Sequence, residues 1–296
     1  MGDYGRLLNR IKGGLYGVAV GDALGGTTEF MTPHEIKEKH GYLTEIIGGG
    51  VWRLEPGEVT DDTMMTLCVA EGLLVNPDDP REAIGTRFIE WYGTKPKDIG
   101  NIIRQSLRNY EGDWFEAAFL AHMDLGQSAG NGSLMRCLPV AMAYTDLKDI
   151  ERISRMQSKM THYDERSGEA CVLYNRIAYR LLHGEPLADA VRRELQGTMY
   201  EDLLHSEPNC EPGGFVVHTF RWVIHLVLHS SSFGEIVQKA ANLGGDSDTI
   251  GAIAGGLAGV YYGYDGIPAE YAEAILVKER LETAAVRLLE LRLSRM

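Results

Sequence analysis

The chain has 296 residues, of which 44% are hydrophobic and 24% are charged. This profile is typical of a globular protein, and it excludes wholesale disorder, collagen-like repeats and coiled-coil rods. Asp and Glu number 42 against 29 Lys and Arg, which gives a formal charge of −13. Because duplex DNA and anionic membranes bind basic surfaces, this balance argues against both as main partners.

The four cysteines are widely spaced and form no Cys-x-x-Cys pair, which argues against a disulfide framework or a zinc-thiolate site. The N-terminal segment has no long apolar stretch of the kind found in signal peptides. No segment approaches the roughly 20 apolar residues that span a bilayer. We therefore expect a cytoplasmic protein with reduced thiols and no membrane span.

Apolar residues recur at helical spacing through most of the chain. The first predicted helix covers residues 7–18 and runs toward Gly21-Asp22. Further helices are predicted over residues 64–74, 171–182, 215–228, 233–243, 250–261 and 269–291. Period-two alternation is nearly absent, and no linker or long repeat divides the chain. The sequence thus predicts a compact all-α fold with one domain over residues 1–296.

Two acidic segments each precede a predicted helix: Thr60-Asp61-Asp62-Thr63 and Asp246-Ser247-Asp248-Thr249. Hard divalent cations prefer oxygen ligands, chiefly carboxylates supplemented by hydroxyls, carbonyls and water. Two such segments facing each other would supply enough ligands for a binuclear Mg²⁺ or Mn²⁺ site. The spacing is not that of an EF-hand, because the twelfth position counted from Asp246 is Leu257 rather than Glu.

Helix capping is the competing interpretation of each segment, since Thr, Asp and Ser are preferred N-cap residues. One side chain suffices to cap a helix, however, and each segment here contains three candidates. The adjacent carboxylates of Asp61 and Asp62 also repel each other unless a cation lies between them. The pair of segments therefore favours metal binding.

The predicted helix that follows Asp248 is rich in Gly and Ala over residues 251–259. Interior Gly costs about 1 kcal/mol relative to Ala in a helix, so this composition needs a packing reason. Close packing against a neighbouring helix would hold the acidic N-terminus rigidly at the centre of the fold.

Other polar positions are weaker candidates when taken alone. Glu29 follows a Gly-rich turn and is a candidate acid or base, although a solvated carboxylate is an equal alternative. The loop 130–132 is Gly-rich at an expected helix start, where free N–H groups could bind phosphate. His162 is an isolated histidine, for which a structural role is the default.

Five motifs occur in order along the chain: GDALG at 21–25, TDDT at 60–63, GNGSLMR at 130–136, TH at 161–162 and GGDSDTIGAIAGGLAG at 244–259. Together they resemble the ADP-ribosylglycohydrolase family. Within this family, the segments GDALGGTTEFMT, GGGVWRL and KPKDIGN and the overall length resemble the branch of dinitrogenase reductase-activating glycohydrolases. The resemblance extends over essentially the whole chain, and the ordered combination of TDDT with GGDSDT is its most specific part.

The resemblance implies an all-α fold around two divalent cations, Mg²⁺ or Mn²⁺. The metal ligands it implies are Thr60, Asp61, Asp62, Asp246, Asp248 and Thr249. Glu29 resembles the family's glutamate near the metals, and Asp98 resembles the acidic residue at the scissile ribose. These two are the catalytic candidates.

The remaining implied site residues bind the nucleotide. Asn131, Gly132 and Ser133 would hold the diphosphate through backbone N–H groups. Phe215 matches an aromatic residue beside adenine, and His162 matches the histidine that lines the ligand site. The chain departs from the pattern at His218, where members of the nitrogenase-linked branch tend to have Asp.

The implied activity is hydrolysis of the N-glycosidic bond of ADP-ribosyl-arginine, with an ADP-ribosylated protein as partner and a monomeric enzyme. Alternative activities are hydrolysis of ADP-ribosyl-serine, O-acetyl-ADP-ribose or another ADP-ribose conjugate. A non-catalytic ADP-ribose binder is a further alternative, against which the intact acidic segments argue.

Overall fold

The computed structural model describes residues 2–296, and within them the chain forms helices and no β-strand. The α-helices are α1 (Asp3–Gly25), α2 (Pro33–His40), α3 (Asp61–Val75), α4 (Arg81–Gly93), α5 (Asn101–Arg108), α6 (Trp114–Leu125), α7 (Pro139–Ala143), α8 (Leu147–Lys159), α9 (Glu165–Leu182), α10 (Leu187–Leu195), α11 (Val216–Leu228), α12 (Phe233–Leu243), α13 (Ser247–Tyr262), α14 (Ala269–Ala274) and α15 (Lys278–Ser294). The predicted all-α class is confirmed. Most of the buried apolar side chains form one continuous cluster.

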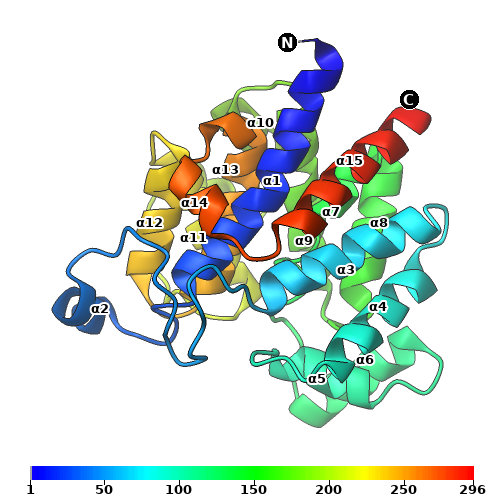
Figure 1. Ribbon diagram of the computed structural model, residues 1–296. Coiled ribbons are helices and arrows are strands. Elements are labelled where there is room, and N and C mark those ends of the chain that lie inside the picture. The colour runs from blue at the N-terminus through cyan, green and yellow to red at the C-terminus, as the bar shows by residue number, and fades with distance from the viewer. Residues whose placement is uncertain (1) are drawn as a thin grey trace.

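Helices α1 and α13 pack against each other at the centre of the fold (Figure 1). Glycines repeat every fourth residue on both helices, and they face each other in antiparallel pairs. A Cβ on Gly17 would lie 2.0 Å from the carbonyl oxygen of Gly255, and one on Gly259 would lie 1.9 Å from that of Gly13. The two backbones are therefore in direct contact, which is the packing reason expected for the Gly-rich segment.

This antiparallel contact positions the acidic residues. Asp22 lies in the last turn of α1, beside the N-terminus of α13 that carries Asp248. A Cβ on Gly25 would lie 2.5 Å from the Cα of Asp248, so the two chain segments touch there as well. The acidic end of α13 is thus held rigidly in the interior.

The predicted helix over 269–291 is wrong as a single element. The chain forms α14 and α15, and at Ile275 the backbone is extended, with φ −63° and ψ 128°. The N–H of Leu276 donates to the carbonyl oxygen of Gly57, and a Cβ on Gly57 would lie 1.8 Å from the carbonyl oxygen of Ala274. A loop from elsewhere in the chain therefore takes the hydrogen bonds that a continuous helix would use.

The other predicted helices are present, with ends that differ by a few residues from the predicted ones. None of the helices within residues 2–296 combines the length and apolarity needed to cross a membrane.

Candidate metal centre and active site

The N-terminus of α3 is capped by a residue of another helix. Asp22 of α1 accepts hydrogen bonds from the backbone N–H groups of Thr60 and Thr63, at 3.0 and 3.1 Å, and from both hydroxyls. The side chain of Thr60, at the N-cap position, makes no capping bond of its own. Because Asp22 satisfies these donors, Asp61 and Asp62 are not needed as caps.

Helix α13 also has no side-chain cap at its N-cap residue, Asp246. Asp248, two residues further on, accepts a hydrogen bond from the backbone N–H of Thr249 at 2.8 Å. This contact uses Oδ1 and leaves the second carboxylate oxygen of Asp248 to other partners. The capping interpretation is thus rejected for both acidic segments.

The two segments meet at Asp62, which is fully buried. The hydroxyl of Thr249 donates to Asp62 Oδ2 at 3.3 Å, and the hydroxyl of Thr60 donates to the same oxygen at 3.2 Å. Among residues 2–296, Asp62 Oδ1 has no hydrogen-bond partner. A buried carboxylate oxygen without a partner is costly, which points to a ligand at this position.

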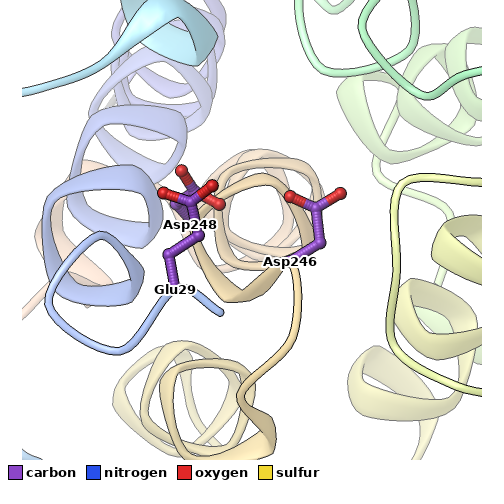
Figure 2. Close-up of side chains that lie close together, drawn as sticks. All are labelled: Glu29, Asp246 and Asp248. Atoms are coloured by element: carbon purple, nitrogen blue, oxygen red, sulfur yellow. The ribbon is translucent and has the colours of Figure 1, made fainter. Parts of the chain in front are cut away.

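Glu29 lies with the second acidic segment. One carboxylate oxygen from each of Glu29, Asp246 and Asp248 lies within 4.8 Å of the others, and Figure 2 shows the three side chains together. The indole N–H of Trp52 donates to Glu29 Oε2 at 2.5 Å and fixes its orientation. This is a group of hard oxygen ligands within reach of one cation.

The most buried carboxylates repel one another. Burial raises the pKa of both Asp62 and Asp248 well above the ordinary value, and repulsion from neighbouring carboxylates raises each pKa further. For Asp62 these neighbours are Asp22, Asp61, Asp98 and Asp246. Because a bound cation would relieve this repulsion, the donor set fits divalent cations.

The surrounding carboxyls show the same effect to different degrees. Burial raises the pKa of Asp61 to about 6, and it raises the pKa of both Asp22 and Glu29 to about 7. Burial also raises the pKa of Asp98 to about 9, with repulsion from Asp61 as the next cause. Perturbed carboxyls of this kind are typical of functional sites.

Asp98 lies in the loop between α4 and α5. The N–H of Gly100 in the same loop donates to Asp61 Oδ2 at 3.2 Å and ties the loop to the acidic cluster. Asp98, Asp61 and Trp91 border a cavity of about 150 Å³. Asp98, which the resemblance places at the scissile ribose, therefore lies at the edge of the acidic cluster.

The Gly-rich loop packs directly on His162. A Cβ on Gly130 or on Gly132 would lie 3.1 Å from the imidazole, so a side chain at either position would press on the ring. Thr161 Oγ1 lies 2.8 Å from His162 Nδ1 and accepts a hydrogen bond from the buried Arg136 at 2.9 Å. Because burial lowers the pKa of His162 well below its ordinary value, the ring is neutral. The histidine supports the loop.

Asn131 differs from the expectation that its backbone N–H is free for a phosphate. Its N–H donates to the carbonyl oxygen of Gly214, and residues 131–136 form turns before α7 rather than a helix start. Its side-chain amide donates to Asp246 Oδ2 at 2.6 Å and to Thr219 at 3.0 Å. Asn131 therefore orients a carboxylate of the acidic cluster.

Gly132 and Ser133 differ from Asn131 in their backbone N–H groups. Within residues 2–296 neither residue donates this group to a protein acceptor, and both residues are buried. The Ser133 hydroxyl itself points into the interior, 2.8 Å from the hydroxyl of Ser158.

Phe215 lies beside this loop, because residue 215 pairs with Gly130 in an isolated bridge. Its ring is partly buried and packs edge-on against His218, with ring centroids 4.9 Å apart, and under the guanidinium of Arg166 at 5.3 Å. His218, at which the chain departs from the family pattern, therefore contacts the aromatic ring that the resemblance places beside adenine.

Two residues of the site were not assigned from the sequence. Asp22 carries a recognisable signal, since a carboxylate in the apolar last turn of a predicted helix has to be satisfied once it is buried. Trp52 carries none, because its role depends on the fold of the 41–60 loop.

Comparison with known proteins identifies the architecture. The family model for ADP-ribosylglycohydrolase matches residues 4–295. The chain belongs to the ADP-ribosylglycohydrolase family. It is 35% identical over 277 residues to the ADP-ribosyl-[dinitrogen reductase] glycohydrolase of Rhodospirillum rubrum, with 93% of this chain and 92% of that protein covered.

Two further relatives of this ADP-ribosylglycohydrolase extend the comparison. The ADP-ribosylarginine hydrolase Tri1 of Pseudomonas putida is 31% identical, over 96% of this chain and 78% of that protein. A solved structure described as an ADP-ribosylglycohydrolase-related protein complex superposes with a TM-score of 0.84 at 31% identity, covering 99% of this chain and 100% of the other.

Proposed function

We propose that this ADP-ribosylglycohydrolase removes ADP-ribose from modified arginine side chains of proteins by hydrolysing the N-glycosidic bond. The observation that carries the proposal is the contact between two acidic helix N-termini at Asp62, where, within residues 2–296, one buried carboxylate oxygen has no hydrogen-bond partner and neighbouring carboxylates repel the group. Two relatives with at least 31% identity are named for ADP-ribosylarginine or ADP-ribosyl-dinitrogen-reductase hydrolysis, which supports the choice of substrate.

Two divalent cations, Mg²⁺ or Mn²⁺, are part of the proposal. The residues proposed to hold them are Thr60, Asp61, Asp62, Asp246, Asp248 and Thr249, with Glu29 close to the last three. When bound, such cations supply Lewis acidity and orient the ribose hydroxyls. They would also reduce the repulsion between the chain, whose formal charge is −13, and the anionic diphosphate of the substrate.

The protein groups bind and orient the nucleotide part of the substrate. Gly132 and Ser133 present backbone N–H groups on the rigid support of His162. Phe215 offers a ring face for the adenine. Asn131 keeps the carboxylate of Asp246 in a fixed orientation between this nucleotide side and the acidic cluster.

Glycosidic cleavage has an oxocarbenium-like transition state and needs a proton donor for the departing group and an activated water. We assign the proton step to Asp98. Glu29 lies among carboxylates within reach of one cation, whereas Asp98 stands outside that group in the described residues, on a loop at its edge. In the metal-free protein a carboxyl whose pKa is about 9 keeps its proton at neutral pH.

We further propose that residues 1–296 act as one domain, because one hydrophobic cluster runs through the helical fold, and that this domain acts as a monomer. The test of the function is release of ADP-ribose from arginine-linked and serine-linked protein substrates, with Mn²⁺ and with excess chelator. We expect Mn²⁺-dependent release from the arginine-linked substrate. Full activity in chelator would contradict the metal proposal, and release from serine alone would contradict the linkage.

A further inference from the structure

A cavity of about 580 Å³ opens beside Glu29, on the side of the acidic cluster that faces α2. Its lining residues include Glu29, Phe30, Glu35, Glu38 and Lys39. Glu29 thus belongs both to the acidic cluster and to the lining of this cavity.

Phe30 combines a strained backbone with an exposed ring. Its φ is +62°, in the left-handed region that residues other than glycine rarely adopt, and its exposed fraction is 65%. The conformation is held by the loop before α13: the Phe30 N–H donates to the carbonyl oxygen of Gly245 at 2.7 Å, and the Gly245 N–H donates to that of Met31 at 2.9 Å. Burial of the ring does not offset the strain, which points to a functional role.

The ring of Phe30 is joined to Glu29 through one residue. It meets Trp52 edge-to-face, with centroids 6.4 Å apart and planes at 68°, and the Trp52 indole donates to Glu29. The three side chains therefore form a continuous wall from the acidic cluster to the cavity.

The nucleotide and the leaving group should lie on opposite sides of the cluster. Figure 2 shows Asp246 between Glu29 on one side and the ribbons of the central and later part of the chain on the other. Asn131, in the loop proposed to bind the diphosphate, bonds to Asp246, whereas the cavity lining contains Glu29 rather than Asp246. A ribose over the cluster would thus point its C1 substituent toward Glu29 and the cavity.

The chemistry of the cavity wall favours a planar cation. Three glutamates and one lysine give it a negative balance, and hydrogen bonds from Thr32 lower the pKa of Glu35, which keeps that group charged. A guanidinium stacks on an aromatic face and pairs with carboxylates. Resting on the proposed function above, we propose that Phe30 and these glutamates form the leaving-group subsite, which takes the arginine side chain of the substrate.

The test replaces the ring without stressing the backbone. Phe30→Gly removes the ring and suits a positive φ, so its melting temperature should equal or exceed that of the wild type. We expect kcat/KM for arginine-linked ADP-ribose to fall about tenfold, while the Kd for free ADP-ribose, which has no leaving group, stays within about twofold. Phe30→Tyr, which keeps the aromatic face, should retain the arginine activity.

Lys95→Gly is the matched control, because Lys95 has a similar φ of +59° and lies outside the cavity wall. It should change stability in the same direction and leave both the arginine activity and the ADP-ribose affinity unaffected. An unchanged arginine activity in Phe30→Gly, or an equal loss of ADP-ribose affinity, would overturn the subsite. Absence of arginine hydrolysis in the wild-type protein would instead contradict the proposed function, so the two failures are distinguishable.

Discussion

Asp22 caps helix α3 and so leaves two other carboxylates, those of Asp61 and Asp62, free to bind a ligand. By accepting the donors at the start of α3 from a neighbouring helix, it leaves the carboxylates of Asp61 and Asp62 unengaged as caps. The same acidic residues at a helix N-terminus would otherwise be read as ordinary caps. The distinction between cap and ligand therefore depends on a residue about 40 positions away.

Asn substitutions separate these two roles, because Asn is as good an N-cap as Asp. We expect Asp62→Asn and Asp248→Asn to abolish turnover and to reduce the rise in melting temperature on adding Mn²⁺. The metal-free variants should be as stable as the wild type or more stable, because each loses one charge from a repelling group. Asp146→Asn is the control, since Asp146 caps α8 by accepting the N–H of Lys148. Near-wild-type turnover in both variants would rule out a metal centre at these residues.

Gly132 tests the diphosphate loop. The β-carbon of Gly132→Val would lie 2.8 Å from Ile103 and 3.1 Å from the His162 ring, so the loop has to shift. We expect the Kd for ADP-ribose, measured by calorimetry, to rise at least about tenfold, which corresponds to about 1.4 kcal/mol. Unchanged affinity would assign this loop a structural role only.

At the scale of elements, the contact between α1 and α13 makes the centre possible. Its glycines bring two backbones so close that any side chain would collide with a carbonyl group. The benefit is that the C-terminus of α1 and the N-terminus of α13 are fixed relative to each other without flexible side chains between them. Rigid support of this kind keeps ligands in place before a cation binds.

Gly17→Ala tests this contact at a distance from the acidic residues. Its Cβ would lie 2.0 Å from the Gly255 carbonyl oxygen, so the helices must separate, and we expect a loss of at least about 3 kcal/mol in the free energy of unfolding. Gly168→Ala in α9 is the matched control, because its nearest neighbour would be 3.9 Å away. That variant should be neutral or up to about 1 kcal/mol more stable. Denaturant unfolding compares the two, and equal stability of both would contradict the close contact.

At the scale of the whole molecule, the buried carboxyls make stability depend on pH. Burial raises the pKa values of Asp22, Glu29, Asp61 and Asp98 to between about 6 and about 9 in the folded metal-free protein. The folded state therefore binds more protons than the unfolded state above about pH 4, where unfolded carboxyls ionise. Their contribution to stability is complete below that pH and is lost as the pH rises through the folded values.

We accordingly expect the melting temperature of the metal-free protein to fall between pH 5.5 and pH 8.5. The increase in melting temperature caused by Mn²⁺ should grow over the same range, because cations bind the deprotonated carboxylates. Thermal scans in chelator and in Mn²⁺ at several pH values measure both trends. The double variant Asp62→Asn/Asp248→Asn should show a weaker dependence, and a metal effect that is independent of pH would contradict this account.

The sequence by itself determined the helical class, the positions of the main helices and the two acidic segments. Helical periodicity and the preference of hard cations for oxygen are local properties, so residues such as Asp61 and Asp248 could be selected without any coordinates. The Gly-rich stretch over residues 251–259 also predicted close helix packing, because so many glycines in a helix are otherwise unfavourable.

Only the tertiary structure decided which of those groups meet and which donors are already used. It broke the predicted 269–291 helix at a backbone contact with Gly57, engaged the N–H of Asn131 with Gly214 and placed Trp52 on Glu29. It also put Phe30 in a strained position beside a cavity. These features depend on contacts between distant segments, and no local pattern encodes a hydrogen bond whose partner lies elsewhere in the chain.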